Sequence, residues 1–185
     1  MKLVDLIDNS KTDKNTIHAY LDTYEELFSP LKESATNILE LGINQIGSLK
    51  LWNDYFTNAN IYGVNIYDSP EYNLLNQYDR IKFKKSDPYN VNFIKSEFID
   101  KDIKFDVLID DGPHSLESVI FFVRNYSLLL NKNGVLIVED IQNPDWIPII
   151  KNSFPDEFQN EKLSVVDVRM KKFRYDDMLI VCKND

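Results

Sequence analysis

Short apolar runs recur along this chain of 185 residues, and most of them lie beside one of its five glycines. Four of the runs read NILELG (37–42), NIYGVNI (60–66), FDVLID (105–110) and GVLIVED (134–140), and longer amphipathic segments separate them. Buried parallel strands have continuous apolar runs of this kind, and they alternate with helices that cover the sheet. The pattern therefore predicts an α/β fold with a mostly parallel sheet.

The amphipathic segments predict the helices. Residues 14–31 carry apolar side chains at helical spacing up to Pro30, so we expect one helix before the first strand. Further helices are expected over residues 48–55, 91–98, 117–130 and 145–152, and a weaker strand over residues 81–86. The long crossovers that parallel strands need are thus available.

The end of the chain has a different pattern. KLSVVDVRM (162–170) and DDMLIVCKN (176–184) have the composition of strands, and the link KKFRYD is too short for a helical crossover. We therefore expect a C-terminal antiparallel hairpin. A mostly parallel sheet with this ending is similar to the Rossmann-like fold of class I methyltransferases, and ligands bind such sheets beyond the carboxyl ends of the strands.

Composition narrows the class of protein. With 43% hydrophobic and 28% charged residues, we expect a single domain over residues 1–185, with residues 1–30 as an N-terminal helical segment. The net charge is −9 without a dense basic block, so nucleic acid is not an expected partner. Short apolar runs and the absence of a signal-peptide pattern predict a cytoplasmic protein without membrane contact. Cys182 is the only cysteine, so any metal ion must be held by oxygen or histidine.

Two predicted strands end in acidic pairs, Asp110–Asp111 and Glu139–Asp140. Neighbouring strands lie about 4.8 Å apart, so up to four carboxylates would meet where ligands bind. Such charges raise one another's pKa unless a cation neutralises them, and a hard divalent ion (magnesium, with manganese or calcium as alternatives) is the simplest solution. The alternative is that these acids cap helices or face solvent. Glu139 and Asp140 can reach one ion only if the backbone turns there.

His114 follows Asp111 by three residues, across a Gly-Pro pair that bends the chain. Beside a metal ion, its imidazole is suited to take a proton from a hydroxyl group. The alternative reading is a helix cap or a solvated side chain.

A second set of residues predicts a cofactor loop. LELGINQIGS resembles the glycine-bearing loop after a first strand, although its glycine spacing is not GxGxxG. Glu40 before Gly42 is more characteristic of S-adenosylmethionine (SAM) sites than of dinucleotide sites. The ribose acid expected after the second strand is Asn65 here, with Asp68 as a substitute, and Asp87 is a candidate partner for the adenine amino group.

Five segments carry a family resemblance: TDKNTIHAYLDTYEELFSPL, ILELGINQIGSLKLWNDYF, IYGVNIYD, FDVLIDDGPHS and NGVLIVEDIQ. They occur in the same order in the macrolide-sugar and rhamnosyl O-methyltransferases, from about Thr12 to Trp146. The resemblance implies SAM- and magnesium-dependent methyl transfer to a hydroxyl of a sugar acceptor, either a small molecule or a glycan. The compact chain leaves a homo-oligomer or an open cleft as ways to complete the acceptor site.

The resemblance also implies roles for individual residues. Asp111, Glu139 and Asp140 would be the metal ligands, which makes Asp111 catalytic together with His114, the general base. Glu40, Gly42 and Ser48 would belong to the cofactor loop, and Asp110 is placed with the cofactor-binding residues. His18, Tyr20 and Tyr24 match the family's N-terminal pattern, with packing the favoured role of the tyrosines.

Three departures from the family pattern keep other functions open. Pro113 replaces the usual serine before the histidine, Asn65 replaces the ribose acid, and Lys84 stands where an acid often follows the third strand. The alternatives are a catechol-type methyltransferase, an NAD-dependent oxidoreductase, which the glycine spacing disfavours, and a non-catalytic Rossmann-like binding module.

Overall fold

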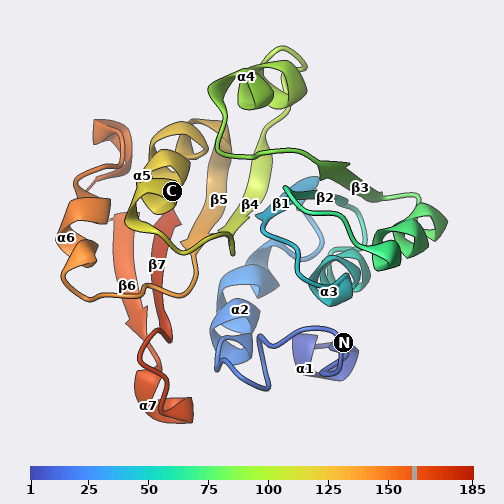
Figure 1. The fold of residues 1–185 in the computed structure, drawn as a ribbon, viewed down its shortest axis with the longest axis horizontal. Helices are drawn as coiled ribbons and strands as arrows, with labels where there is room; N and C mark the ends of the chain where they lie inside the picture. Colours follow the sequence, from blue (N-terminus) through green and yellow to red (C-terminus); the bar gives the residue numbers. More distant parts are fainter. Residues whose placement is uncertain (160–161) are drawn as a thin grey trace.

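The protein is built on one seven-stranded sheet, seen in a computed structural model that describes residues 1–159 and 162–185 (Figure 1). The strand order is β3-β2-β1-β4-β5-β7-β6. The strands are β1 (Asn37–Leu41), β2 (Asn60–Asn65), β3 (Ile81–Lys85), β4 (Phe105–Asp110), β5 (Leu130–Val138), β6 (Leu163–Asp167) and β7 (Met178–Lys183). β1 to β5 are parallel, and β7 runs antiparallel to both β5 and β6. The predicted Rossmann-like fold with a C-terminal hairpin is confirmed.

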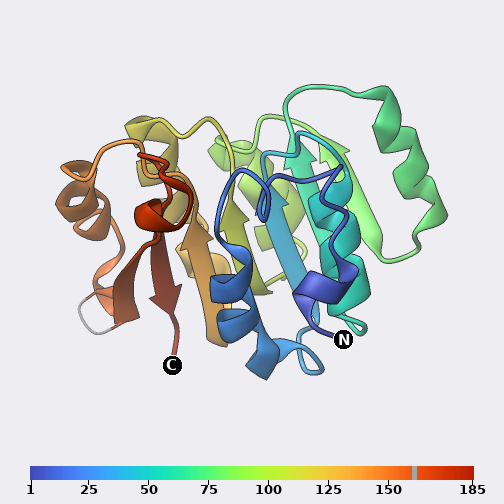
Figure 2. The same ribbon diagram turned by 90° about the horizontal axis from the view of Figure 1, so that it is seen from below.

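Helices cover both faces of the sheet (Figures 1 and 2). One face packs on α1 (Leu3–Leu6), α2 (Leu21–Phe28) and α3 (Gly47–Tyr55), and the other on α4 (Val91–Ile94), α5 (Leu116–Asn125) and α6 (Trp146–Lys151). The other helical segments are η1 (Ser29–Leu31), η2 (Pro70–Gln77), η3 (Lys95–Ile99), η4 (Ser127–Leu129), η5 (Asp156–Phe158) and α7 (Arg169–Lys172). In the described part of the chain, no helix has the length and apolarity needed to cross a bilayer.

The strands are apolar on both sides because both sides are buried. Ile38 and Leu39 are consecutive and fully buried, one in each of the two cores. A strand with one solvated face would alternate apolar and polar residues. This is why the apolar runs located the strands correctly.

The predicted helix over residues 14–31 is wrong in its first half. The helix α2 begins at Leu21, residues 14–17 form a turn, and the rest of residues 12–20 is irregular. Lys14 is buried, with 1% of its surface exposed, whereas Ile17 is 49% exposed. Polar contacts of the lysine therefore override the apolar periodicity that predicted a continuous helix, and the N-terminal segment is helical only at residues 3–6 and 21–31.

The hairpin places β7, the last strand, against β5. Val165 pairs with Ile180 within the hairpin, and Ile180 pairs with Val138 of β5. The link between the two strands carries the short helix α7. It therefore lies at the same edge of the sheet as the carboxyl ends of β4 and β5.

The carboxyl ends of β1, β4 and β5 meet at one edge. β4 lies between β1 and β5, with Asp110 in register with Leu41 on one side and Val138 on the other. Gly42 follows β1 with φ of +84° and lies against the chain after β4, where an added Cβ would be 1.9 Å from the carbonyl oxygen of Asp111. Only glycine combines this backbone conformation with so close an approach.

We predict that Gly42→Ala destabilises the protein by about 2–5 kcal/mol, because it adds left-handed backbone strain to a steric collision. Gly134→Ala is the matched control. It has no positive φ, and its added Cβ would lie 2.9 Å from the nearest atoms. Urea unfolding of both variants measures the difference, and an equal loss in the two would contradict this account.

Candidate active site

Four carboxylates gather at the carboxyl edge of the sheet, but they are not the four at the strand ends. Asp111, Glu139 and Asp140 lie on the α2 side together with Glu40 of β1, which replaces Asp110 in the set. Asp110 points to the other side of the sheet, because successive strand residues alternate. The backbone turn that Glu139 and Asp140 require is present, since Asp140 has a left-handed φ of 53°.

Lys14 lies at the centre of this cluster, and sequence reasoning gave it no role. Its Nζ is 2.7 Å from Asp111 Oδ2, 2.7 and 2.8 Å from the two oxygens of Glu139, and 3.2 Å from Glu40 Oε1. Burial would lower the pKa of Lys14, but the charges of the three carboxylates raise it above its ordinary value, so the side chain stays charged. The one signal was its position in the TDK pattern of the family resemblance.

Two tyrosines of the N-terminal segment also donate hydrogen bonds to these carboxylates. Tyr24 donates a hydrogen bond to Glu139 Oε1, and Tyr20 donates one to Asp140 Oδ1. Both rings are fully buried, and burial together with the neighbouring carboxylates raises the pKa of both phenols. The tyrosines therefore remain protonated donors, and they position acids as well as filling the core.

Two carboxylate oxygens and one imidazole nitrogen face a common point. His114 Nε2 lies 3.7 Å from Asp111 Oδ1 and 3.7 Å from Asp140 Oδ2. Neither oxygen accepts a hydrogen bond from the residues that the structure describes. The three side chains are partly exposed, at 24%, 11% and 25% for Asp111, Asp140 and His114. This arrangement fits a magnesium ion, which is typically held by one or two carboxylates and keeps several waters.

The predicted ligands are therefore divided between two groups that share Asp111. Asp111, His114 and Asp140 form an outer group, whose ligand atoms lie within 4.8 Å of one another. Glu40, Asp111 and Glu139 form an inner group with the same spacing. Lys14 contacts all three acids of the inner group.

A cavity of about 690 Å³ adjoins the carboxylates. It is lined by the loops that follow β1, β2, β3 and β4 and reaches Asp111. Among its lining residues are four predicted cofactor residues, Gly42, Asn65, Asp68 and Asp87. The cavity thus lies beyond the carboxyl ends of the strands, where a nucleotide-like cofactor is expected.

The other three predicted cofactor residues do not line this cavity. Ser48 lines a smaller hollow of about 260 Å³ beside the loop over residues 9–17. Glu40 is fully buried, where it accepts a hydrogen bond from Trp52 Nε1 at 2.9 Å. Asp110 is 3% exposed and accepts one from the hydroxyl of Tyr89 at 2.5 Å.

Asn65 is used to connect loops. Its Nδ2 donates to the carbonyl oxygen of Ile43 and to the hydroxyl of Tyr72, both at 2.8 Å, and its Oδ1 accepts from the Ile66 N–H at 3.1 Å. Asp68 is exposed and pairs with Lys85 at 3.1 Å. The amide of Asn65 therefore holds the cavity wall and keeps one lone pair for a ligand.

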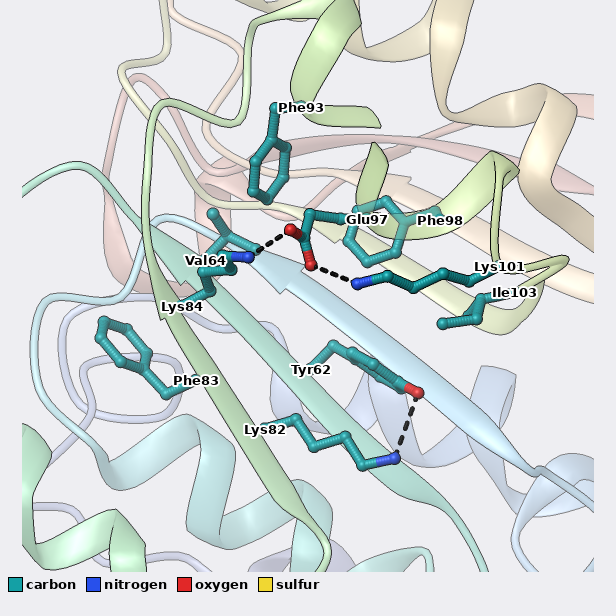
Figure 3. Close-up of a pocket in the computed structure, with 10 residues that line it drawn as sticks. All are labelled: Tyr62, Val64, Lys82, Phe83, Lys84, Phe93, Glu97, Phe98, Lys101 and Ile103. Carbon is teal, nitrogen blue, oxygen red and sulfur yellow. Dashed lines mark hydrogen bonds and ion pairs between the residues drawn. The ribbon is translucent and has the colours of Figure 1, made fainter. Parts of the chain in front are cut away.

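Lys84, the third departure from the family pattern, faces a different hollow of about 260 Å³ on the α4 side of the sheet (Figure 3). There Lys84 and Lys101 both point to the carboxylate of Glu97, and Lys82 reaches the hydroxyl of Tyr62. The acid in this hollow is thus already neutralised. Lys84 is not among the residues that line the cofactor-sized cavity.

Comparisons with known proteins agree on the fold. MycE methyltransferase of the mycinamycin biosynthetic pathway, solved with Mg and SAH, matches with a TM-score of 0.69 at 20% identity, over 91% of this chain and 50% of that one. Fibrillarin from Aeropyrum pernix, solved with SAM, matches with a TM-score of 0.61 at 18% identity, over 83% and 68%. The chain has the Rossmann-like fold of class I methyltransferases.

The curated relatives narrow the resemblance to sugar O-methyltransferases, which confirms the family resemblance of the motifs. One is the 8-demethyl-8-alpha-L-rhamnosyl tetracenomycin-C 2'-O-methyltransferase of Streptomyces olivaceus, 29% identical over 79% of this chain and 39% of the relative. Another is the mycinamicin VI 2''-O-methyltransferase of Micromonospora griseorubida, 24% identical over 81% and 38%. The chain spans about two fifths of the length of these relatives. No family model matches it.

We predict that Asp110→Asn flattens the pH dependence of stability. Burial raises the pKa of Asp110 to about 7, against the opposing hydrogen bond from Tyr89, whereas its ordinary value is 3.8. Between these two pKa values the folded state binds a proton that the unfolded state has lost. The contribution of Asp110 to stability is therefore fully present below pH 3.8, the ordinary pKa, and is lost as the pH rises through the folded-state pKa of about 7. The slope from this residue is at most about 1.4 kcal/mol per pH unit.

Urea unfolding between about pH 4 and pH 8 measures this slope in the wild type and the variant. The exposed Asp145→Asn is the control and should leave the slope unchanged. A wild-type slope preserved in Asp110→Asn would show that Asp110 does not titrate in this way.

Proposed function

We propose that this chain is a SAM-dependent O-methyltransferase domain that methylates a sugar hydroxyl with the help of a divalent ion. One observation carries the proposal. The cofactor-sized cavity ends at Asp111, and the Oδ1 atom of that same residue faces His114 and Asp140. Cofactor, ion and base would then meet at one point. The names of the relatives support a sugar acceptor, in a small molecule or a glycan, over a catechol.

The cavity residues suggest how SAM is held. Gly42 allows the cofactor to approach the backbone after β1, and the remaining lone pair of Asn65 together with Asp68 serves the ribose hydroxyls. Asp87 lies in the loop after β3, at the adenine end. Asp110 accepts a hydrogen bond from Tyr89, which lines this cavity, whereas Glu40 and Ser48 lie outside it.

Asp111 and Asp140 would hold the ion through Asp111 Oδ1 and Asp140 Oδ2. When bound, the ion orients the sugar hydroxyls and raises their acidity. His114 Nε2, 3.7 Å from Asp111 Oδ1 and from Asp140 Oδ2, accepts the proton of the reacting hydroxyl. The hydroxyl oxygen bonds to the methyl carbon as the carbon–sulfur bond breaks, and sulfur keeps the electron pair. Orientation of the two reactants supplies much of the rate.

We predict that methyl transfer from SAM to a rhamnosylated acceptor stops in EDTA and returns when Mg²⁺ is added. His114→Gln should lower turnover by about 10²–10⁴-fold, because it removes the proton acceptor, while calorimetric SAM affinity stays unchanged. Glu117→Gln, an exposed change in the first turn of α5, is the matched control. Transfer that persists in EDTA, or full turnover in His114→Gln, would count against the mechanism.

We also predict that restoring an acid at residue 65 weakens the site. In Asn65→Asp, a carboxylate would face the carbonyl oxygen of Ile43, which now accepts from the amide. The expected cost is about 1–3 kcal/mol of stability, with weaker SAM binding because the cavity wall loosens. Unfolding and calorimetry measure both quantities, and tighter SAM binding at unchanged stability would contradict this interpretation of Asn65.

A further inference from the structure

Lys14 and a divalent ion would compete for the same acids. The inner group (Glu40, Asp111, Glu139) and the outer group (Asp111, His114, Asp140) each offer ligand atoms within 4.8 Å of one another, and they share Asp111. A cation with a charge of +2 cannot share the inner group with an ammonium, because the two positive charges would lie within a few ångströms in a buried site.

We propose that Lys14 is the resident cation of the inner group, that it confines the divalent ion to the outer group, and that Glu139 is therefore not an ion ligand. This inference rests on the ion of the proposed function. The family resemblance implies Asp111, Glu139 and Asp140 as metal ligands, and the present proposal removes Glu139 from that set.

The contacts of Lys14 match its donors to its acceptors. An ammonium group has three N–H donors, and Lys14 Nζ donates hydrogen bonds to Asp111 Oδ2 and to both oxygens of Glu139, while Glu40 Oε1 lies in ion-pair contact at 3.2 Å without a hydrogen bond. Both oxygens of Glu139 are engaged, at 2.7 and 2.8 Å, and one of them also accepts from Tyr24. Lys14, Glu40 and Glu139 are at most 2% exposed, so the inner group reaches solvent through Asp111, which is 24% exposed.

Asp111 connects the two groups. Its Oδ2 is bound to Lys14 at 2.7 Å, and its Oδ1 faces His114 at 3.7 Å. Lys14 thereby fixes the rotation of the carboxylate and presents Oδ1 to the outer group. Lys14 is a positioning residue, since it acts on the ion through Asp111.

The loop that carries Lys14 is anchored by the residues that follow the lysine. Lys172 Nζ donates to the carbonyl oxygens of Asn15 and Thr16 at 2.9 and 3.1 Å. His18 Nδ1 lies 2.6 Å from Asp177 Oδ1 and 3.3 Å from Asp140 Oδ1. Because residues 15–18 are held against the link before β7, Lys14 cannot leave the inner group without moving this loop.

The first test compares two acids by calorimetric titration with Mn²⁺ alone, without SAM. Glu139→Gln should keep the ion affinity within about threefold of the wild type, whereas Asp140→Asn should lower it by more than about tenfold. A loss in Glu139→Gln equal to or greater than that in Asp140→Asn would overturn the proposal. This comparison leaves Lys14 in place, so it decides the question even if changes at Lys14 prevent folding.

The second test removes the resident cation. Lys14→Met should bind one more Mn²⁺ per chain than the wild type, because the inner group becomes available, and Lys14→Arg should not. Lys11→Met is the control, since Lys11 lies in the same loop but is 40% exposed and forms its ion pair with Glu71, outside both groups. A folded Lys14→Met that binds Mn²⁺ with wild-type stoichiometry would overturn the proposal.

Ion binding and methyl transfer are separate readouts. If the wild type binds no ion and Lys14→Met binds one, Lys14 occupies the inner group, but the ion of the proposed function is wrong. If neither protein binds an ion, the inference fails, and so does the proposal that a divalent ion assists methyl transfer. If the wild type binds an ion but transfers no methyl group, the inference stands and the proposed activity fails.

Discussion

The buried contact between one ammonium and three carboxylates is the interaction on which the site depends. Glu40, Asp111 and Glu139 come from three neighbouring strands, and parallel pairing alone would leave their charges together in a closed space. Breaking a buried charge pair by removing one partner costs about 3–5 kcal/mol, so loss of Lys14 would be costly. Burial raises the pKa of Glu40 and Glu139, and the charge of Lys14 opposes this rise. The N-terminal segment is thus part of the site, because it supplies Lys14, His18, Tyr20 and Tyr24.

The order of the sheet explains why the cavity of about 690 Å³ and the acidic cluster share a boundary. β1 lies beside β4, so the loop with Gly42 touches the chain at Asp111. Asp111 is the residue that belongs to the cavity, the inner group and the outer group. The position of Asp111 at this boundary therefore depends both on the close approach of Gly42 to its backbone and on the contact with Lys14 that fixes its carboxylate.

Much of the fold could be predicted from the sequence, because strands buried on both faces leave continuous apolar runs and the link between the last two strands is too short for a helical crossover. The link itself covers residues 168–177 and contains α7, so it is longer than the predicted KKFRYD. The proximity of Asp111 and Asp140 could also be predicted, because both come just after the ends of neighbouring parallel strands. Lys14 could not, since lysine is almost always solvent-exposed and its burial depends on acids that are remote in sequence. Its burial also explains the error in the predicted helix, whose apolar spacing included the exposed Ile17. The cross-linking role of Asn65 depends on Ile43 and Tyr72, which no local pattern connects with it.

The proposed mechanism requires a divalent ion between Asp111 and Asp140. Anomalous scattering from crystals grown with Mn²⁺ and SAM would locate this ion. We expect one anomalous peak at about 2–2.3 Å from Asp111 Oδ1 and Asp140 Oδ2, with Lys14 still bound to Glu139. A peak coordinated by Glu139, with Lys14 displaced, would contradict the division into two groups. Crystals with SAM in the cavity and no peak at either group would contradict the metal-dependent mechanism.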